Sequence, residues 1–226
     1  MRKSGRQLIL DWPHEPSSAR EDFLPAPGNA EAFRAIDAWP HWPSPSLLLI
    51  GPAGSGKSHL GAIWARAAGA RRIEGDRLAA ADLVEAASGP ALLIDNADRV
   101  GEHEPLLFHL LNLLKEHGVS ALLTAQSAPN LWGLVTPDLL SRLRLAPTVS
   151  LGAPDVELTH AVLFKLFSDR QLVVDPQVVA YLALRIERSL EAARAVVAAL
   201  DKEALARGKP VTRAMAAALL RDHTET

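Results

Sequence analysis

The residues best suited to chemistry stand together at positions 51 to 58, which read GPAGSGKS directly after the aliphatic run LLLI. Spaced glycines let a backbone turn tightly around phosphate oxygens, with its N–H groups and the positive end of a following helix facing the ligand. In the pattern G-x-x-x-x-G-K-[ST], the lysine contacts the β and γ phosphates and the hydroxyl ligates Mg²⁺. The segment therefore predicts a P-loop that binds the phosphates of a nucleotide. The residues expected to hold the nucleotide are Gly51, Ala53, Gly54, Ser55, Gly56, Lys57 and Ser58.

A second polar group follows the buried-strand pattern ALLIDNAD at positions 91 to 98. Asp95 falls at the carboxyl end of that strand, where ligands bind in open α/β sheets. With a phosphate loop upstream, we expect Ser58 and Asp95 to hold Mg²⁺ rather than Asp95 to serve only as a helix cap. Asn96 takes the position where a carboxylate would activate water, and an amide cannot accept a proton as a carboxylate does. We therefore expect weak intrinsic hydrolysis.

Two further segments carry candidate active-site groups. The strand pattern ALLTAQSAP places Thr124 and Gln126 at a strand end, where either side chain senses the γ phosphate or is an ordinary hydrogen-bonding group. The segment TPDLLSRLRLAP places Arg142 near the end of a short helix. This arginine forms a surface salt bridge or reaches the phosphates of a neighbouring subunit, and spacing alone does not decide between these interpretations.

Composition narrows the class of protein. The chain has 226 residues, of which 48% are hydrophobic, and a net charge of −2, so it lacks an overall positive field that attracts nucleic acid. We expect no direct sequence-specific DNA binding. The sequence contains no cysteine, which excludes disulfides and thiolate zinc sites. Its N-terminal segment has only three consecutive aliphatic residues, too few for a signal peptide or a membrane span, so we expect a cytoplasmic protein.

The order of patterns predicts an α/β protein with a helical C-terminal part. Strand-like runs alternate with helical patterns such as 80–88, which favours a parallel sheet covered by helices on both faces. After Pro154 only helical spacing follows, which indicates a small all-helical domain. The strand-like runs are 47–50, 71–74, 91–95, 121–125 and 148–151. The expected division is a tail at 1–20, a nucleotide-binding domain at 21–152 and a helical domain at 153–226.

This order of motifs resembles the AAA+ module of the bacterial replication initiator DnaA. The resemblance rests on the phosphate loop, LLIDNAD, LLTAQSAP and PDLLSRL, and it extends over about residues 20 to 222. It implies an AAA+ parallel sheet followed by a helical lid domain, with ADP or ATP as the bound nucleotide. Within the opening segment EDFLPAPGNAEAFRAI, the resemblance places Phe23 and Asn29 beside the adenine.

Two departures from the initiator indicate a particular type of relative. The sequence ends soon after its last helical pattern, where the initiator continues into a helix-turn-helix domain, and RQLILDW at positions 6–12 takes the place of the initiator's large N-terminal domain. That segment is similar to the short peptide by which replication proteins bind the sliding clamp; a disordered tail is the alternative. The chain is thus identified as similar to the regulatory inactivator of DnaA (Hda type). The residues expected to bind the clamp are Gln7, Leu8, Leu10 and Trp12.

The resemblance also implies an activity and its residues. A protein of this type negatively regulates replication initiation by stimulating ATP hydrolysis by DnaA in trans, with Arg142 presented to the partner's nucleotide. The lid would add an arginine to its own nucleotide: the family pattern selects Arg188, whereas alignment of the helix starts places Glu191 there. The competing functions are a self-contained motor or helicase loader and a non-catalytic, nucleotide-regulated adaptor.

Overall fold

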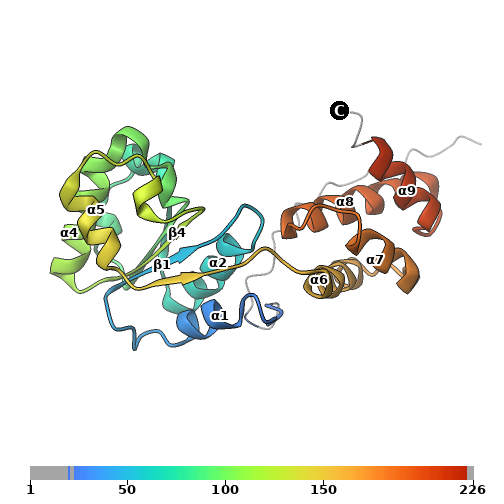
Figure 1. Cartoon of the computed structure of the whole chain (residues 1–226), viewed down its shortest axis with the longest axis horizontal. Helices are drawn as coiled ribbons and strands as arrows, with labels where there is room; N and C mark the ends of the chain where they lie inside the picture. Colours follow the sequence, from blue (N-terminus) through green and yellow to red (C-terminus); the bar gives the residue numbers. More distant parts are fainter. Residues whose placement is uncertain (1–19, 21–22, 223–226) are drawn as a thin grey trace, which may run out of the picture.

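A five-stranded parallel sheet forms the centre of the N-terminal two thirds of the chain (Figure 1). The structure is a computed structural model that describes Arg20 and residues 23–222. The strand order is β2-β3-β4-β1-β5, and every neighbouring pair is parallel. The strands are β1 (Ser46–Ile50), β2 (Arg71–Glu74), β3 (Ala91–Asp95), β4 (Ser120–Ala125) and β5 (Thr148–Ser150). They confirm the five strands predicted from the sequence.

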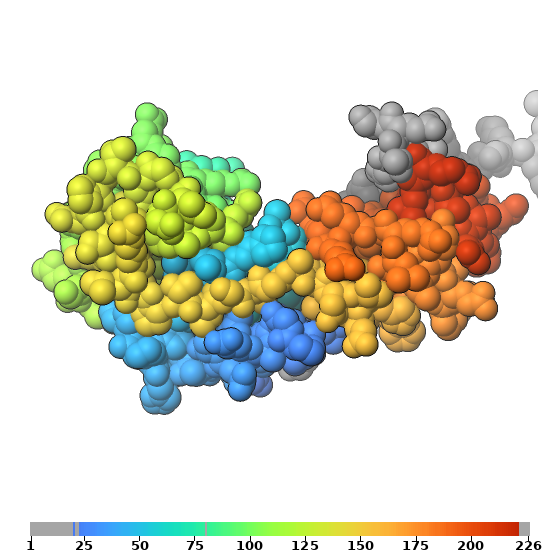
Figure 2. Space-filling model, viewed as in Figure 1, coloured from blue at the N-terminus to red at the C-terminus, as the bar shows by residue number. Residues whose placement is uncertain are grey.

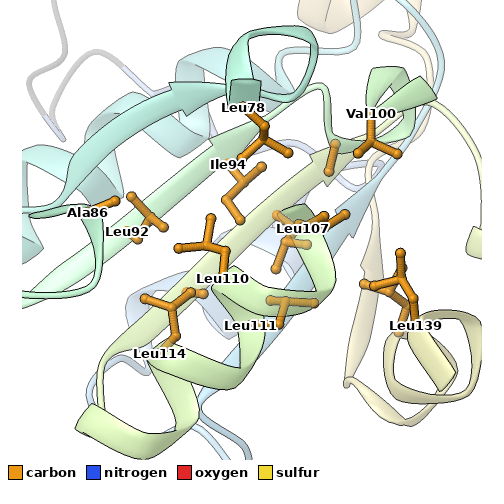
Figure 3. Close-up of a cluster of buried hydrophobic side chains, with 14 of the residues drawn as sticks. Leu78, Ala86, Leu92, Ile94, Val100, Leu107, Leu110, Leu111, Leu114 and Leu139 are labelled. Atoms are coloured by element: carbon orange, nitrogen blue, oxygen red, sulfur yellow. The ribbon is translucent and has the colours of Figure 1, made fainter. Parts of the chain in front are cut away.

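Alternate residues of the central strands face two separate cores, because successive side chains of a strand point to opposite faces. Leu92 and Ile94 pack in the core on the side of α4, whereas Leu93 packs in the core on the side of α2. Figure 3 shows the first of these cores, with Leu92 and Ile94 facing Leu110 of α4. Burial on both faces explains why the sequences of β1, β3 and β4 are largely aliphatic rather than alternating.

Helices cover both faces of this sheet. The segment 80–88, expected to be helical, contains only one turn of α-helix, because a 3-10 helix occupies Gly75–Ala80 and the Asp82 carboxylate then caps the next helix by accepting from Glu85 N–H. The helices of this part are α1 (Ala30–Asp37), α2 (Lys57–Ala68), α3 (Leu83–Ala86), α4 (Glu104–His117) and α5 (Pro137–Leu145). Further 3-10 turns are Ala97–Arg99, Gly101–His103 and Pro129–Leu131.

Four helices follow β5 and form the lid, which has a hydrophobic core of its own. They are α6 (Val156–Asp169), α7 (Pro176–Ala183), α8 (Leu190–Arg207) and α9 (Arg213–Asp222). Figure 1 shows them on one side of the sheet, with the start of α8 beside the loop between β1 and α2. An α/β sheet followed by an all-helical lid is the fold class predicted from the sequence.

Candidate nucleotide site

The glycines of the loop 51–56 adopt conformations that other residues do not tolerate. Gly54 has φ +67° and Gly56 has φ +101°, in the region that favours glycine. A Cβ at Gly51 would lie 2.2 Å from the Leu151 carbonyl oxygen, so only glycine fits there. Ala53 is exposed in the same loop. The sequence thus folds here as a tight loop between β1 and the N-terminus of α2.

Two polar groups of this loop have properties that suit an anionic ligand. Lys57 is buried, and its Nζ donates to the carbonyl oxygens of Gly51 and Pro52, each at 2.8 Å. Burial lowers the pKa of Lys57, and the negative charges of Asp98 and Asp95 oppose that effect. The buried Oγ of Ser55 has no hydrogen-bond partner among the described residues. A buried cation and an unsatisfied hydroxyl beside a helix N-terminus fit a phosphate group.

Asp95 lies at the end of β3 and is fully buried. Its Oδ1 accepts from the Ser58 hydroxyl at 3.2 Å and from the Thr124 hydroxyl in a short hydrogen bond. Its Oδ2 accepts from Arg72 Nη2 at 2.6 Å. The structure therefore brings Ser58 and Asp95 together, as a shared Mg²⁺ site requires, and the ion would be completed by phosphate oxygens and water. Within the described residues, no group of three or more His, Asp or Glu side chains forms a metal site of its own.

Asn96 and Thr124 are linked to each other rather than free. The Asn96 N–H donates to Thr124 Oγ1 at 2.9 Å, and the Asn96 amide donates to Glu74 Oε2 at 3.0 Å. Because the Thr124 hydroxyl donates its only proton to Asp95, it is occupied in positioning that carboxylate. Gln126 is exposed, its N–H donates to Asp98 Oδ2 at 3.0 Å, and its side chain makes no hydrogen bond to the described part of the chain. Of the two residues considered as sensors of the γ phosphate, Gln126 is the one whose side chain is available for such a contact.

A cavity of about 630 Å³ lies between the loop, the opening segment and the lid. This volume lies within the usual range for small-ligand sites. Phe23 lines it and stacks on Phe33, with ring centroids 4.7 Å apart. Asn29 is committed within the protein, because its Oδ1 accepts from Ala26 N–H at 2.7 Å and its Nδ2 donates to the Leu24 carbonyl at 3.0 Å. Asn29 thus fixes the opening segment that forms one wall.

The lid contributes Glu191 and Arg194 to this cavity. Burial lowers the pKa of Arg194, and the nearby Glu191 charge opposes that effect. Arg188 is exposed, lies immediately before the Ser189 N-cap of α8 and is not among the residues that line the cavity. Sequence reasoning missed Arg194, although its spacing of three residues from Glu191 places both on one helix face.

Arg142 lies away from this cavity. Its Nη1 donates to Asn112 Oδ1 of α4, and its guanidinium carbon lies 5.2 Å from the centre of the Phe108 ring. It lines a different cavity, of about 540 Å³, together with residues of α4, α5 and the start of β1. The structure therefore does not bring Arg142 to the chain's own P-loop. The remaining candidates, Gln7, Leu8, Leu10 and Trp12, lie outside the described residues.

The lid rests directly on the phosphate loop. The Leu190 N–H donates to the Gly54 carbonyl oxygen at 2.8 Å, and a Cβ at Gly54 would lie 2.0 Å from Ser189 Oγ. Figure 2 shows the loop surface in contact with the first residues of α8. Gly54 therefore serves both the loop conformation and the approach of the lid.

Comparisons with solved structures identify proteins of similar fold. No protein-family model matches the chain. Domain III of the Thermotoga maritima replication initiation protein DnaA is 23% identical, with a TM-score of 0.81 over 92% of this chain and 97% of that one. AMPPCP-bound DnaA from Aquifex aeolicus is 20% identical, with a TM-score of 0.68 over 82% of this chain and 65% of that one. The Thermotoga maritima Holliday junction branch migration motor RuvB is 16% identical, with a TM-score of 0.70 over 91% and 72% of the two chains.

The chain has the fold of DnaA domain III. The similarity covers both the sheet and the lid, since 92% of this chain is matched. This result confirms the AAA+ fold that the sequence resemblance implied. No helix within residues 20 and 23–222 is long and apolar enough to cross a membrane.

The contact between loop and lid generates a stability prediction. Gly54→Ala should destabilise the protein more than Gly133→Ala, although both positions have positive φ. The matched control carries only the backbone penalty, roughly 1 to 2 kcal/mol, because nothing lies within 4 Å of a Cβ at Gly133. Gly54→Ala adds the clash with Ser189. Calorimetric unfolding of both variants measures the difference, and equal losses would show that the lid does not rest on this loop in solution.

Proposed function

We propose that this AAA+ chain is a negative regulator of DNA replication initiation of the Hda type. It binds ADP or ATP with Mg²⁺ and the DNA polymerase sliding clamp, and it stimulates ATP hydrolysis by DnaA in trans. The observation that carries this proposal is Asn96, an amide at the position of a water-activating carboxylate, beside a complete phosphate loop. Slow hydrolysis of its own nucleotide, expected when an amide replaces that base, suits a chain that acts on the nucleotide of a partner.

Nucleotide binding is supported by the groups gathered around the loop. Lys57 offers a cation, the α2 N-terminus offers N–H groups, and Ser58 with Asp95 offers oxygens for Mg²⁺. AMPPCP, an adenine nucleotide analogue, is bound by the similar DnaA of Aquifex aeolicus. The cavity between Phe23 and Arg194 is the expected place for the base and its sugar.

Replacement of the loop lysine tests this part of the proposal. Lys57→Ala should weaken ADP binding by about tenfold or more, because a charge-assisted contact contributes roughly 1.5 to 3 kcal/mol. Titration calorimetry with ADP gives the affinity. An unchanged affinity in a variant that melts like the wild type would mean that this loop is not the main nucleotide anchor.

The position of Arg142 supports an action on a partner. The contacts with Asn112 and Phe108 hold the guanidinium on the surface of α4 and α5, away from the chain's own cavity. A guanidinium that is already ordered loses less entropy when it contacts a phosphoryl group. Its planar, permanently charged donors suit the charge that develops during phosphoryl transfer.

Arg142→Ala should abolish stimulation of DnaA while ADP binding stays normal. An arginine supplied in trans contributes about 10³- to 10⁵-fold in rate, far more than an exposed salt bridge. Single-turnover hydrolysis of DnaA-bound ATP, with clamp loaded on DNA, measures the effect. Arg144→Ala is the matched control, because Arg144 is exposed on the same helix two residues further on and points in another direction.

The outcomes separate the interpretations of Arg142. Stimulation within a few-fold of wild type would remove Arg142 from the partner's active site. A lowered melting temperature with loss of ADP binding would show that its contacts with α4 serve only the fold.

Clamp binding is proposed from the segment RQLILDW alone. Joint replacement of Gln7, Leu8 and Leu10 by alanine should abolish clamp binding and leave ADP affinity and melting temperature unchanged, since these residues precede the elements that form the nucleotide site. A pull-down with purified clamp tests this, with wild-type protein as the reference. Undiminished clamp binding by the triple variant would contradict the assignment of this segment.

A self-contained motor or helicase loader is the second candidate, favoured by the complete phosphate loop and by the structural likeness to the RuvB motor. This function requires rapid ATP hydrolysis without DnaA, which the amide of Asn96 disfavours. A nucleotide-regulated adaptor would show neither basal turnover nor stimulation of DnaA. Basal turnover therefore identifies the motor, and the absence of both activities identifies the adaptor.

A further inference from the structure

Arg72 joins two carboxylates at the edge of the site where Mg²⁺ is expected. The parallel register pairs Glu74 of β2 with Asp95 of β3, so both side chains lie at neighbouring strand ends. Arg72 Nη2 lies 2.7 Å from Glu74 Oε1 and 2.6 Å from Asp95 Oδ2. Asp95 is fully buried, whereas the Arg72 side chain is about half exposed. A permanent positive charge of the protein thus contacts the carboxylate that would serve the metal.

The other contacts of Asp95 leave Oδ2 as the oxygen at which Arg72 and a metal ion would compete. Hydroxyls of Ser58 and Thr124 both donate to Oδ1, and Arg72 donates to Oδ2. Each carboxylate oxygen has two acceptor positions, so protein donors occupy both positions on Oδ1 and one on Oδ2. A divalent cation that approaches Oδ2 directly or through water meets the guanidinium charge, and like charges repel at such distances.

Neighbouring groups keep this guanidinium in place. Glu74 binds Arg72 with Oε1 and accepts the Asn96 amide at 3.0 Å with Oε2. Both oxygens of Glu74 are therefore engaged, and a displaced Arg72 would leave Glu74 and the buried Asp95 without their cation. Loss of a cation from a buried carboxylate is costly, so Arg72 does not readily give way to a metal ion.

We propose that Arg72 provides beside Asp95 part of the positive charge that Mg²⁺ provides in other phosphate-loop proteins, and that it makes nucleotide binding by this chain only weakly dependent on Mg²⁺. This inference rests on the proposed nucleotide binding and specifies its regulation. The chain retains ADP through Lys57 and the loop backbone when Mg²⁺ is scarce. Together with Asn96, Arg72 favours retention of nucleotide over turnover.

The test is ADP affinity measured by calorimetry with EDTA and with saturating Mg²⁺. Wild-type affinity should change by about threefold or less between the two conditions. Arg72→Gln should bind ADP weakly in EDTA and gain about tenfold or more with Mg²⁺, because Asp95 then lacks its cation. Arg72→Lys keeps the charge and should behave like the wild type. Arg71→Gln is the matched control, since Arg71 lies on the same strand and pairs with the exposed Glu85 at 2.6 Å.

Each outcome bears on the proposal. Equal Mg²⁺ dependence of ADP binding in the wild type and Arg72→Gln would overturn the proposal. A gain in ADP affinity with Mg²⁺ that is as large in Arg71→Gln as in Arg72→Gln would also overturn it. If Arg72→Gln does not fold, the wild type still decides, because a gain of about tenfold or more with Mg²⁺ contradicts the inference. Absence of ADP binding by the wild type in both conditions would instead contradict the proposed function itself.

Discussion

The buried carboxylate of Asp95 is the group on which the arrangement of the site depends. A carboxylate removed from water is stable only with charged or hydrogen-bonding partners, and here they come from three elements. Ser58 is on α2, Thr124 on β4 and Arg72 on β2. The parallel sheet places the carboxyl ends of its strands at one edge, so these partners converge only if β2, β3 and β4 are neighbours. The lid then closes on the same edge through Leu190 and the phosphate loop.

Local patterns were sufficient to predict the strands, the phosphate loop and the lid, because aliphatic runs and helical spacing are properties of contiguous sequence. The meeting of Ser58 and Asp95 was also predicted, because a phosphate-loop hydroxyl and a later strand-end aspartate together serve Mg²⁺ in phosphate-loop proteins. The contact of Arg72 with Asp95 was not predicted, because it depends on the pairing of β2 with β3. The four residues of β2 do not indicate which strand lies next to them. The lid residue Arg194 was missed because the choice was confined to Arg188 and Glu191; the placement of α8 against the cavity decides which positions line it.

The separation of two sites explains how one chain would hold a nucleotide and act on another. The lid forms one wall of the cavity beside the phosphate loop, and Ser58, Thr124 and Arg72 all donate to the carboxylate of Asp95. Arg142 lies on a different surface, ordered by Phe108 and Asn112. In this account, bound nucleotide stabilises the arrangement of sheet and lid, while the arginine surface meets the partner. The weak hydrolysis expected from Asn96 is then a requirement of the function rather than a defect.

The most direct test is hydrolysis of ATP bound to the cognate DnaA, measured with and without this protein and with and without DNA-loaded clamp. The account predicts slow hydrolysis by DnaA alone, slow hydrolysis by this protein alone, and a large acceleration only when DnaA, this protein and the loaded clamp are present together. Rapid hydrolysis by this protein alone, or no acceleration of DnaA in the complete mixture, would contradict the account.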